Sequence, residues 1–248
     1  STTGPVKTLA FSRDGRMLAT AGADTLIHLW DVSPTTYQIR ERAVLKGHHD
    51  AVNALAFSPG GTMLASASAD LTVRLWNTEL GIPQATFEGH SDEVSAVTFG
   101  LNGHVLISGS WDKTIRLWDL KGETQGTLLG EHDDWVRELR TSPGGTVLAS
   151  AGKDMTVRLW DLYDARCMHI LHAHFGGADA VAFSPDGGLL ATSGRDQRIK
   201  LWGVTEGNAL ATLEGHTKPV MSLDFNPNGT MLAAGGGDNL ISLWTVKQ

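Results

Sequence analysis

Tryptophan, histidine and aspartate recur at one fixed spacing along most of this 248-residue chain. Six of the eight tryptophans are separated by 46 residues and then four times by 42 residues. Five histidines also recur every 42 residues, each 28 residues before one of these tryptophans, and an aspartate follows each histidine by 22 residues. A period of about 40 residues indicates a repeat architecture. The chain is therefore predicted to contain six copies of one unit.

Each copy is predicted to contain short strands and no helix. In the second copy, residues 51–57 (AVNALAF) and 72–76 (TVRLW) alternate small or polar with apolar side chains, and SPGG at 58–61 is a turn signal. Four short strands in about 42 residues cannot bury a face alone, so neighbouring copies must pack on one another. We therefore predict an all-β β-propeller of six repeats with four-stranded antiparallel blades.

Two dipeptides, Gly-His and Trp-Asp, recur within this period, and with this spacing the chain resembles the WD-repeat β-propeller family. The pairs are Gly47-His48, Gly89-His90, Gly215-His216, Trp30-Asp31, Trp118-Asp119 and Trp160-Asp161. The resemblance implies a single domain over residues 1–248, with repeats at 1–46, 47–88, 89–130, 131–172, 173–214 and 215–248. Some copies depart from the pattern: the residue after tryptophan is Asn77, Gly203 or Thr245, and Glu131 and Ala173 replace the glycine.

Each complete copy also places a serine or threonine 18 residues after its histidine. A His/Ser/Asp set is compatible with nucleophilic catalysis, but a catalytic site occurs once in a domain and this set occurs four times in full. The resemblance implies instead a buried hydrogen-bond chain from Asp to His to hydroxyl to Trp. The residues of this network are His48, Ser66, Asp70, Trp76, His90, Ser108, Asp112, Trp118, His132, Ser150, Asp154, Trp160, His174, Thr192, Asp196, Trp202, His216, Asp238 and Trp244.

The two terminal copies are expected to be the weakest, because each lacks one member of the set. Ala234 stands at the hydroxyl position of the sixth copy, and Thr2 stands at the histidine position of the first. The sixth copy ends after its third strand, so one interpretation is a six-bladed ring with a three-stranded last blade and an exposed edge at 240–246. The other is that the chain is part of a longer protein whose upstream segment closes the ring.

Composition restricts the function classes. The single cysteine, Cys167, excludes a disulfide scaffold and a cysteine-based zinc site and favours a reducing, cytoplasmic location. The formal net charge of −7 argues against nucleic-acid binding. No signal peptide and no apolar run of membrane-spanning length is present, so no membrane partner is expected. No spacing suggests a metal site, a phosphate loop or a cofactor.

Function is expected where the copies differ, and the resemblance places ligand contacts on the face that carries the Asp turns. The residue before the turn aspartate is small in copies 1, 2 and 6 and large or cationic in copies 3 to 5. The residue three after the histidine also differs between copies. Aromatic and cationic side chains favour a peptide with an apolar anchor and an acidic or phosphorylated residue. The candidate partner-binding residues are Trp111, Trp135, Arg137, Lys153, Arg195 and Glu93.

The favoured function is a non-catalytic scaffold or sensor domain that binds a protein or peptide over blades 3 to 5. An equally weighted interpretation of Trp111 and Trp135 is that they pack on each other and cap a core. One alternative function is an oligomerisation module that self-associates through the open edge of the last blade. A less favoured alternative is an enzyme at the channel mouth, for which Glu93 and Asp179 are the only candidate carboxylates.

Overall fold

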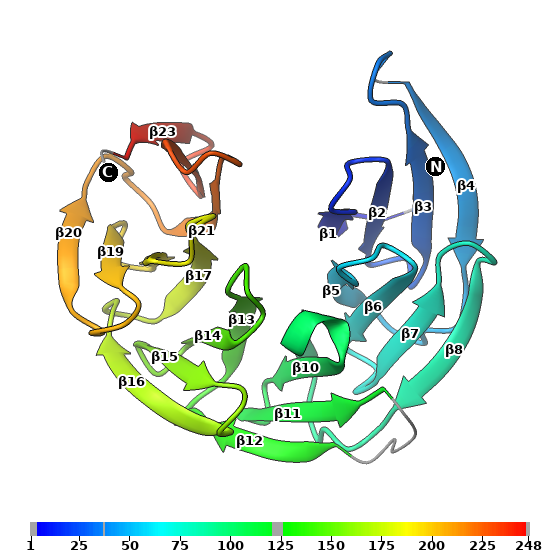
Figure 1. Ribbon diagram of the computed structural model, residues 1–248, viewed down its shortest axis with the longest axis horizontal. Coiled ribbons are helices and arrows are strands. Elements are labelled where there is room, and N and C mark those ends of the chain that lie inside the picture. The colour runs from blue at the N-terminus through cyan, green and yellow to red at the C-terminus, as the bar shows by residue number, and fades with distance from the viewer. Residues whose placement is uncertain (1–3, 37, 121–125, 247–248) are drawn as a thin grey trace. The chain divides into compact units, whose positions relative to one another are not determined.

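The computed structural model describes residues 4–36, 38–120 and 126–246. In these ranges the chain forms strands β1 to β23 and one short 3-10 helix, η1 (Leu101–Gly103) (Figure 1). The strands form six antiparallel sheets, called blades 1 to 6 below, of which the first five have four strands and the sixth has three. The predicted all-β class and the three-stranded last blade are confirmed. No helix in the described ranges is long and apolar enough to cross a bilayer.

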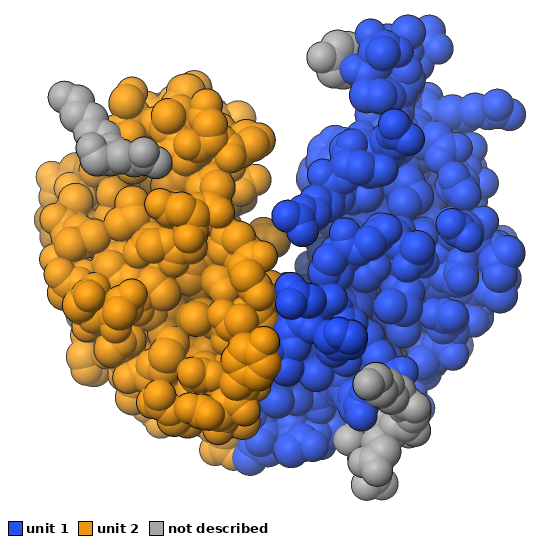
Figure 2. Space-filling view, viewed as in Figure 1, with its two compact units in different colours: residues 1–129 blue, residues 130–248 orange. Residues whose placement is uncertain are grey.

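The chain divides into two compact units, residues 1–129 and residues 130–248 (Figure 2). The boundary falls inside the last strand of blade 3. Thr2, the residue at the missing histidine position, lies outside the described residues. The expectation of a single domain stays a prediction.

Unit 1 holds blades 1 and 2 and nearly all of blade 3, and within each blade the strands pair in chain order. Its strands are β1 (Val6–Phe11), β2 (Met17–Gly22), β3 (Ile27–Val32), β4 (Ile39–Leu45), β5 (Val52–Phe57), β6 (Met63–Ser68), β7 (Val73–Asn77), β8 (Ile82–Phe87), β9 (Val94–Gly100), β10 (Val105–Ser110), β11 (Thr114–Asp119) and β12 (Thr127–Glu131).

Unit 2 holds blades 4, 5 and 6, which follow the same strand order. Its strands are β13 (Val136–Thr141), β14 (Val147–Gly152), β15 (Thr156–Asp161), β16 (Arg166–His172), β17 (Ala178–Phe183), β18 (Leu189–Gly194), β19 (Ile199–Gly203), β20 (Ala209–Leu213), β21 (Val220–Phe225), β22 (Met231–Gly236) and β23 (Ile241–Thr245).

Each phased tryptophan sits in the third strand of its blade, opposite a leucine in the second. In blade 2, Leu64 faces Phe57 on one side and Trp76 on the other. The same row recurs in blade 5 as Phe183, Leu190 and Trp202. Side chains in one cross-strand row share a face of the sheet, so the row gives each blade a continuous apolar surface.

Successive blades within a unit share their cores. In unit 2, Val157 and Leu159 of blade 4 cluster with Val181 and Leu190 of blade 5, all of them fully buried. This packing requires the alternation of apolar positions on both faces of each blade, which explains why one copy alone cannot fold. Because successive blades pack face to face, a side chain on the first strand of one blade lies beside the preceding blade of its unit.

Blade 6 differs because no fourth strand follows β23 in the described chain. Ile241 and Leu243 of β23 are 80% and 62% exposed, whereas Val157 and Leu159 at the corresponding positions of blade 4 are completely buried. The apolar pattern of β23 is the same as in blade 4, where blade 5 of the same unit packs on these positions.

Candidate functional site

The repeated polar residues form a continuous hydrogen-bond chain in blade 2. His48 Nδ1 lies 2.8 Å from Asp70 Oδ2, and His48 Nε2 lies 2.7 Å from Ser66 Oγ. The indole N–H of Trp76 donates to the same Ser66 oxygen at 2.8 Å. An ionised carboxylate can only accept, so the histidine proton is assigned to Nδ1. In the neutral ring Nε2 then accepts from the serine hydroxyl.

The other three complete copies repeat this geometry closely. The His–Asp distance is 2.8–2.9 Å, the His–hydroxyl distance 2.7–2.8 Å and the Trp–hydroxyl distance 2.8–2.9 Å in blades 3, 4 and 5. All four hydroxyl residues, Ser66, Ser108, Ser150 and Thr192, are fully buried. A buried hydroxyl is out of reach of a substrate, which favours the structural role predicted for this set over a catalytic one.

Hydrogen bonds keep the network aspartates ionised. Burial by itself raises the pKa of Asp70, but the hydrogen bonds that it accepts from His48, Thr72 and the backbone N–H of His49 outweigh burial and hold its pKa below the usual range. The pKa values of Asp112 and Asp154 are lowered in the same way, against the same effect of burial. Burial lowers the pKa of His174, and this outweighs the opposite effect of Asp196. Burial therefore favours the neutral ring at His174.

The terminal blades contain incomplete chains. In blade 6, His216 Nδ1 lies 3.0 Å from Asp238 Oδ2, but its buried Nε2 has no partner among the described residues, because Ala234 replaces the hydroxyl. The backbone N–H of Thr217 contributes most to lowering the pKa of Asp238 to about 2. In blade 1, Trp30 donates to Thr20 at 3.0 Å. An orphaned buried acceptor costs free energy, so we expect blade 6 to be weaker than blades 2 to 5.

The turn aspartates also shape the turn between the second and third strands of every blade. The residue after each aspartate has a φ of 64–76° although none of the six is glycine. In each turn the aspartate carboxylate accepts the backbone N–H two residues on, at 2.9–3.4 Å. This bond offsets the cost of the left-handed conformation.

The two variable positions on this Asp-turn face are neighbours in all six blades. The residue before each turn aspartate donates its backbone N–H to the residue three after the histidine, at 2.8–3.1 Å. In blade 4 this bond joins Lys153 to Trp135, and in blade 3 it joins Trp111 to Glu93. The phase of the sequence therefore identifies side chains that emerge side by side at one end of each blade.

Trp111 and Glu93 are both half-buried and belong to unit 1, whereas Trp135 belongs to unit 2. Because the two tryptophans belong to different units, the interpretation that they pack on each other stays a prediction. In unit 2, Lys153 Nζ lies 3.8 Å from the centre of the Trp135 ring and 3.4 Å from an Asp134 carboxylate oxygen. The lysine thus lies over the face of the indole in a cation–π contact.

Arg137 and Arg195 meet at one carboxylate. Arg137 Nη1 donates to Oδ1 of Asp179, and Arg195 Nε lies 2.9 Å from Oδ2 of the same residue. The Asp179 side chain is only 4% exposed, Arg137 is 17% exposed and Arg195 is 44% exposed. Asp179, one of the two carboxylates considered for an enzyme site, is therefore held between two guanidinium groups of blades 4 and 5.

Gly177 lies against both the Trp135–Lys153 pair and the Arg137–Asp179–Arg195 group. It accepts the backbone N–H of Arg195 at 3.1 Å, and a Cβ on it would stand 3.3 Å from Lys153 Cα and 2.9 Å from the Arg137 guanidinium. Its φ of 114°, which follows a φ of 81° at Gly176, is a conformation that favours glycine. Trp135, Lys153, Arg137, Asp179, Arg195 and Phe175 are therefore called the blade 4–5 patch below.

Phe175 is a member of this surface that the sequence reasoning missed. It directly follows His174, precedes Gly176 and is 83% exposed. A signal was present: the corresponding residues His49, Ser91, Asp133 and Thr217 are polar in the other described blades. An apolar phenylalanine at a position that is polar elsewhere, followed by two glycines, indicates that this loop has a binding role that the other loops do not share.

The sequence analysis also gave no role to Glu138, whose side chain contacts the next blade. It accepts the backbone N–H of Val181 in the next blade at 2.9 Å and lies 2.8 Å from Arg140. Burial raises its pKa, while Arg140 and the Val181 N–H act in the opposite direction without cancelling it. The corresponding first-strand positions elsewhere hold only small residues, Thr8, Ala54, Ala96, Ala180 and Ser222.

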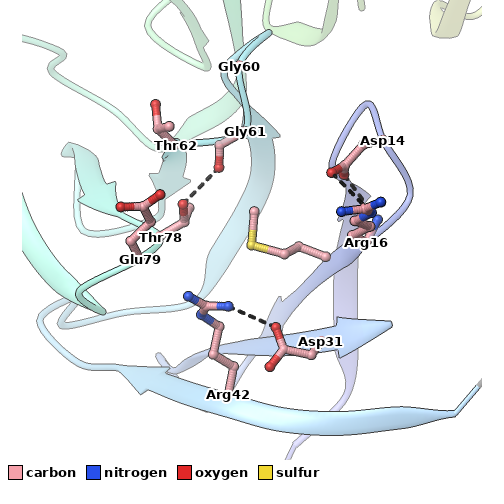
Figure 3. Close-up of a pocket in the computed structure, with 10 residues that line it drawn as sticks. Asp14, Arg16, Asp31, Arg42, Gly60, Gly61, Thr62, Thr78 and Glu79 are labelled. Carbon is pink, nitrogen blue, oxygen red and sulfur yellow. Dashed lines mark hydrogen bonds and ion pairs between the residues drawn. The ribbon is translucent and has the colours of Figure 1, made fainter. Parts of the chain in front are cut away.

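Unit 1 has a cavity of about 420 Å³ at the ends of blades 1 and 2 that carry the turns between the first and second strands (Figure 3). Arg42 and Asp31 form an ion pair of 2.9 Å on one wall, and Arg16 and Asp14 approach to 4.0 Å on another. Met17 also lines the cavity. The cavity lies at the opposite ends of the strands from the Asp turns, and none of the sequence-predicted site residues lines it.

The family model described as WD domain, G-beta repeat matches residues 1–31, 39–77, 81–119, 122–161, 165–203 and 207–245. Each matched segment ends one residue after a phased tryptophan. The second segment begins with β4, the last strand of blade 1, and continues through β7 of blade 2. The family's sequence unit is therefore offset by one strand from the blade. No curated protein gives a match to the sequence.

Proposed function

Because the chain belongs to the WD domain, G-beta repeat family, we propose that it is a non-catalytic scaffold or sensor domain that binds a peptide or protein segment on its Asp-turn face. The principal contact is the blade 4–5 patch, and Trp111 with Glu93 offers a further contact on blade 3. The partner is a protein, and the binding site uses no metal or cofactor.

The uneven distribution of side chains on this face carries the proposal. Trp135, Lys153 and Arg195 stand at positions where blades 1, 2 and 6 have only alanine, glycine or proline. At the position of Arg137, two residues after Trp135, these blades have Lys7, Asn53 and Met221. Aromatic and arginine side chains are the most enriched at binding hot spots. Phe175, which is largely exposed, adds apolar area to the same surface. A scaffold alone has no need of these residues, because blades 2 and 3 fold around the same network without them.

The test is peptide selection followed by substitution. A displayed library of random peptides is selected on the wild-type chain, and the affinity of a selected peptide is measured by fluorescence anisotropy. Trp111→Ala and Trp135→Ala together are expected to weaken binding at least about tenfold. Tyr163→Ala is the control, since Tyr163 is an aromatic residue, 71% exposed, in the turn between β15 and β16, at the opposite end of blade 4. Full affinity in the folded double variant would show that the site is misplaced.

A second candidate function is self-association through blade 6, which the three-stranded sheet favours because β23 has no fourth strand beside it in the described residues. An open strand edge with apolar side chains is a template for pairing with another chain. Light scattering would then give the mass of a dimer for the wild type and of a monomer for Ile241→Lys/Leu243→Lys. A monomeric wild type at all accessible concentrations excludes this function.

A further inference from the structure

We propose that Asp179 sets the charge selectivity of the blade 4–5 patch, so that the patch accepts one carboxylate from an aspartate or glutamate side chain of its peptide rather than a phosphate. This inference rests on the proposed function, because it names the ligand class of the same surface. It depends on three features of unit 2: the sharing of Asp179, the free edge of Arg195 and the position of Phe175.

The charges of the patch do not balance. Lys153 lies 3.4 Å from the Asp134 carboxylate, so this pair is neutral overall. Arg137 and Arg195 share the single negative charge of Asp179. One positive charge therefore remains, and it is a property of the Arg137–Asp179–Arg195 triad.

The geometry assigns that charge to Arg195. Arg137 and Asp179 are mostly buried, so they neutralise each other inside the protein. Arg195 donates to Asp179 through Nε, and no described residue accepts a hydrogen bond from its Nη atoms. Because its side chain is 44% exposed, these two nitrogens are accessible to a ligand. Their parallel N–H groups fit the two oxygens of one carboxylate.

Phe175 places an apolar contact next to this cation. The side chain is 83% exposed, and a Cβ on the adjacent Gly176 would stand 3.1 Å from Arg195 Cβ. The loop that carries the phenylalanine is therefore packed against the arginine. A peptide with an apolar residue close to an acidic one would engage both side chains.

A phosphate suits this arrangement less well than a carboxylate. A phosphorylated serine carries a charge of about −1.5 to −2 at neutral pH and needs more than one cation. Arg137 would supply the second cation only if Asp179 did not hold it. Asp179 thereby acts as an internal competitor that lowers the charge of the patch from two to one.

The experiment measures three matched peptides against four variants. A peptide selected on the wild type is synthesised with glutamate, glutamine or phosphoserine at its acidic position, and each dissociation constant is measured at one ionic strength by anisotropy. The wild type is expected to bind the glutamate peptide about tenfold more tightly than either of the other two. Arg195→Gln is expected to abolish the difference between glutamate and glutamine.

Two variants test the charge count directly. Asp179→Asn leaves two unpaired guanidinium groups, so the phosphoserine peptide is expected to become the tightest ligand. Arg137→Gln/Asp179→Asn returns the triad to one positive charge and is expected to restore the preference for glutamate. A purely structural role for Asp179 would give no such restoration. Arg166→Gln is the control, because Arg166 is an exposed arginine of blade 4 at the start of β16, at the opposite end of the blade from the Asp turn.

The outcomes separate this inference from the proposed function. Equal binding of the glutamate and glutamine peptides by the wild type, or tighter binding of phosphoserine, overturns the inference, while a loss on Trp135→Ala still supports peptide binding. Failure of the double variant to regain glutamate preference also overturns it. If Asp179→Asn or the double variant does not fold, the Arg195→Gln comparison decides. If selection yields no peptide, or selected peptides ignore the Trp111→Ala/Trp135→Ala change, the proposed function fails and this inference fails with it.

Discussion

Blades 4 and 6 carry the same histidine and aspartate at the same spacing but place them in different surroundings. In blade 4, His132 has an acceptor at one ring nitrogen and the Ser150 hydroxyl at the other. In blade 6, the second nitrogen of His216 is buried and has no partner in the part of the chain that the structure describes. The difference arises from one hydroxyl and one strand. The histidine and aspartate at this spacing therefore identify a blade, but they do not determine how stable that blade is.

The largest effect is expected from removing the carboxylate of a complete blade. Asp154→Ala deprives His132 of its acceptor and removes the turn bond to the Thr156 N–H, so a loss of about 3 kcal/mol in the free energy of unfolding is expected. For a chain of this size this lowers the melting temperature by roughly 10 °C. Asp24→Ala removes a turn bond of 3.4 Å in a blade that has threonine at the histidine position, so about 1 kcal/mol is expected.

Thermal melts of the two variants, followed by circular dichroism, check this order. Equal losses for Asp154→Ala and Asp24→Ala would contradict the account of the network, because the His132 bond would then contribute nothing.

The next largest changes in the free energy of unfolding are a loss in blade 4 and a gain in blade 6. Ser150→Ala leaves the Trp160 indole and His132 Nε2 without their shared partner and should cost about 2 kcal/mol. Ala234→Ser supplies the hydroxyl that His216 lacks, and should stabilise the chain by about 1 kcal/mol. Urea unfolding measures both changes.

Ala233→Ser is the control for the gain in blade 6, because the neighbouring residue of β22 points to the other face of the sheet. A gain of similar size at both positions would mean that the hydroxyl acts through something other than His216.

A separate effect is expected from acid, which protonates several network aspartates together. The folded pKa values of Asp70, Asp112 and Asp154 lie below the usual 3.8, so between these values the unfolded chain binds more protons than the folded one. Their contribution to stability is complete above about pH 4 and is lost as the pH falls. Asp238, with a pKa lowered to about 2, loses its contribution between pH 3.8 and about 2.

Unfolding free energies measured from neutral pH to pH 2 should therefore fall most steeply below pH 4. Asp154→Asn should flatten this slope, because the group that titrates has been removed. An unchanged slope in that variant would argue that Asp154 has an ordinary pKa in the folded protein.

The local features of the fold follow from the sequence because they depend on spacing along one chain. The 42-residue phase predicted the six sheets, the three-stranded last blade and the face on which the variable residues lie. A hairpin fixes which residues face each other, so the neighbours Trp135 and Lys153 were predictable from phase alone.

Contacts between blades were less predictable. Arg137 and Arg195 were identified as candidate ligand contacts, but nothing in the spacing indicated that Asp179 holds both of them. Phe175 escaped notice because it occupies a position that is usually polar, and Glu138 because its partner, the Val181 N–H, lies in the following blade.

The sequence by itself therefore determined the family, the blade architecture and the end of each blade on which the variable side chains emerge. Only the tertiary structure decided which charges are already neutralised and which remain open to a partner. The physical reason is that strand pairing is set by local register, whereas the sharing of a buried carboxylate depends on how two blades pack. The single unbalanced charge at Arg195 is a result of that packing.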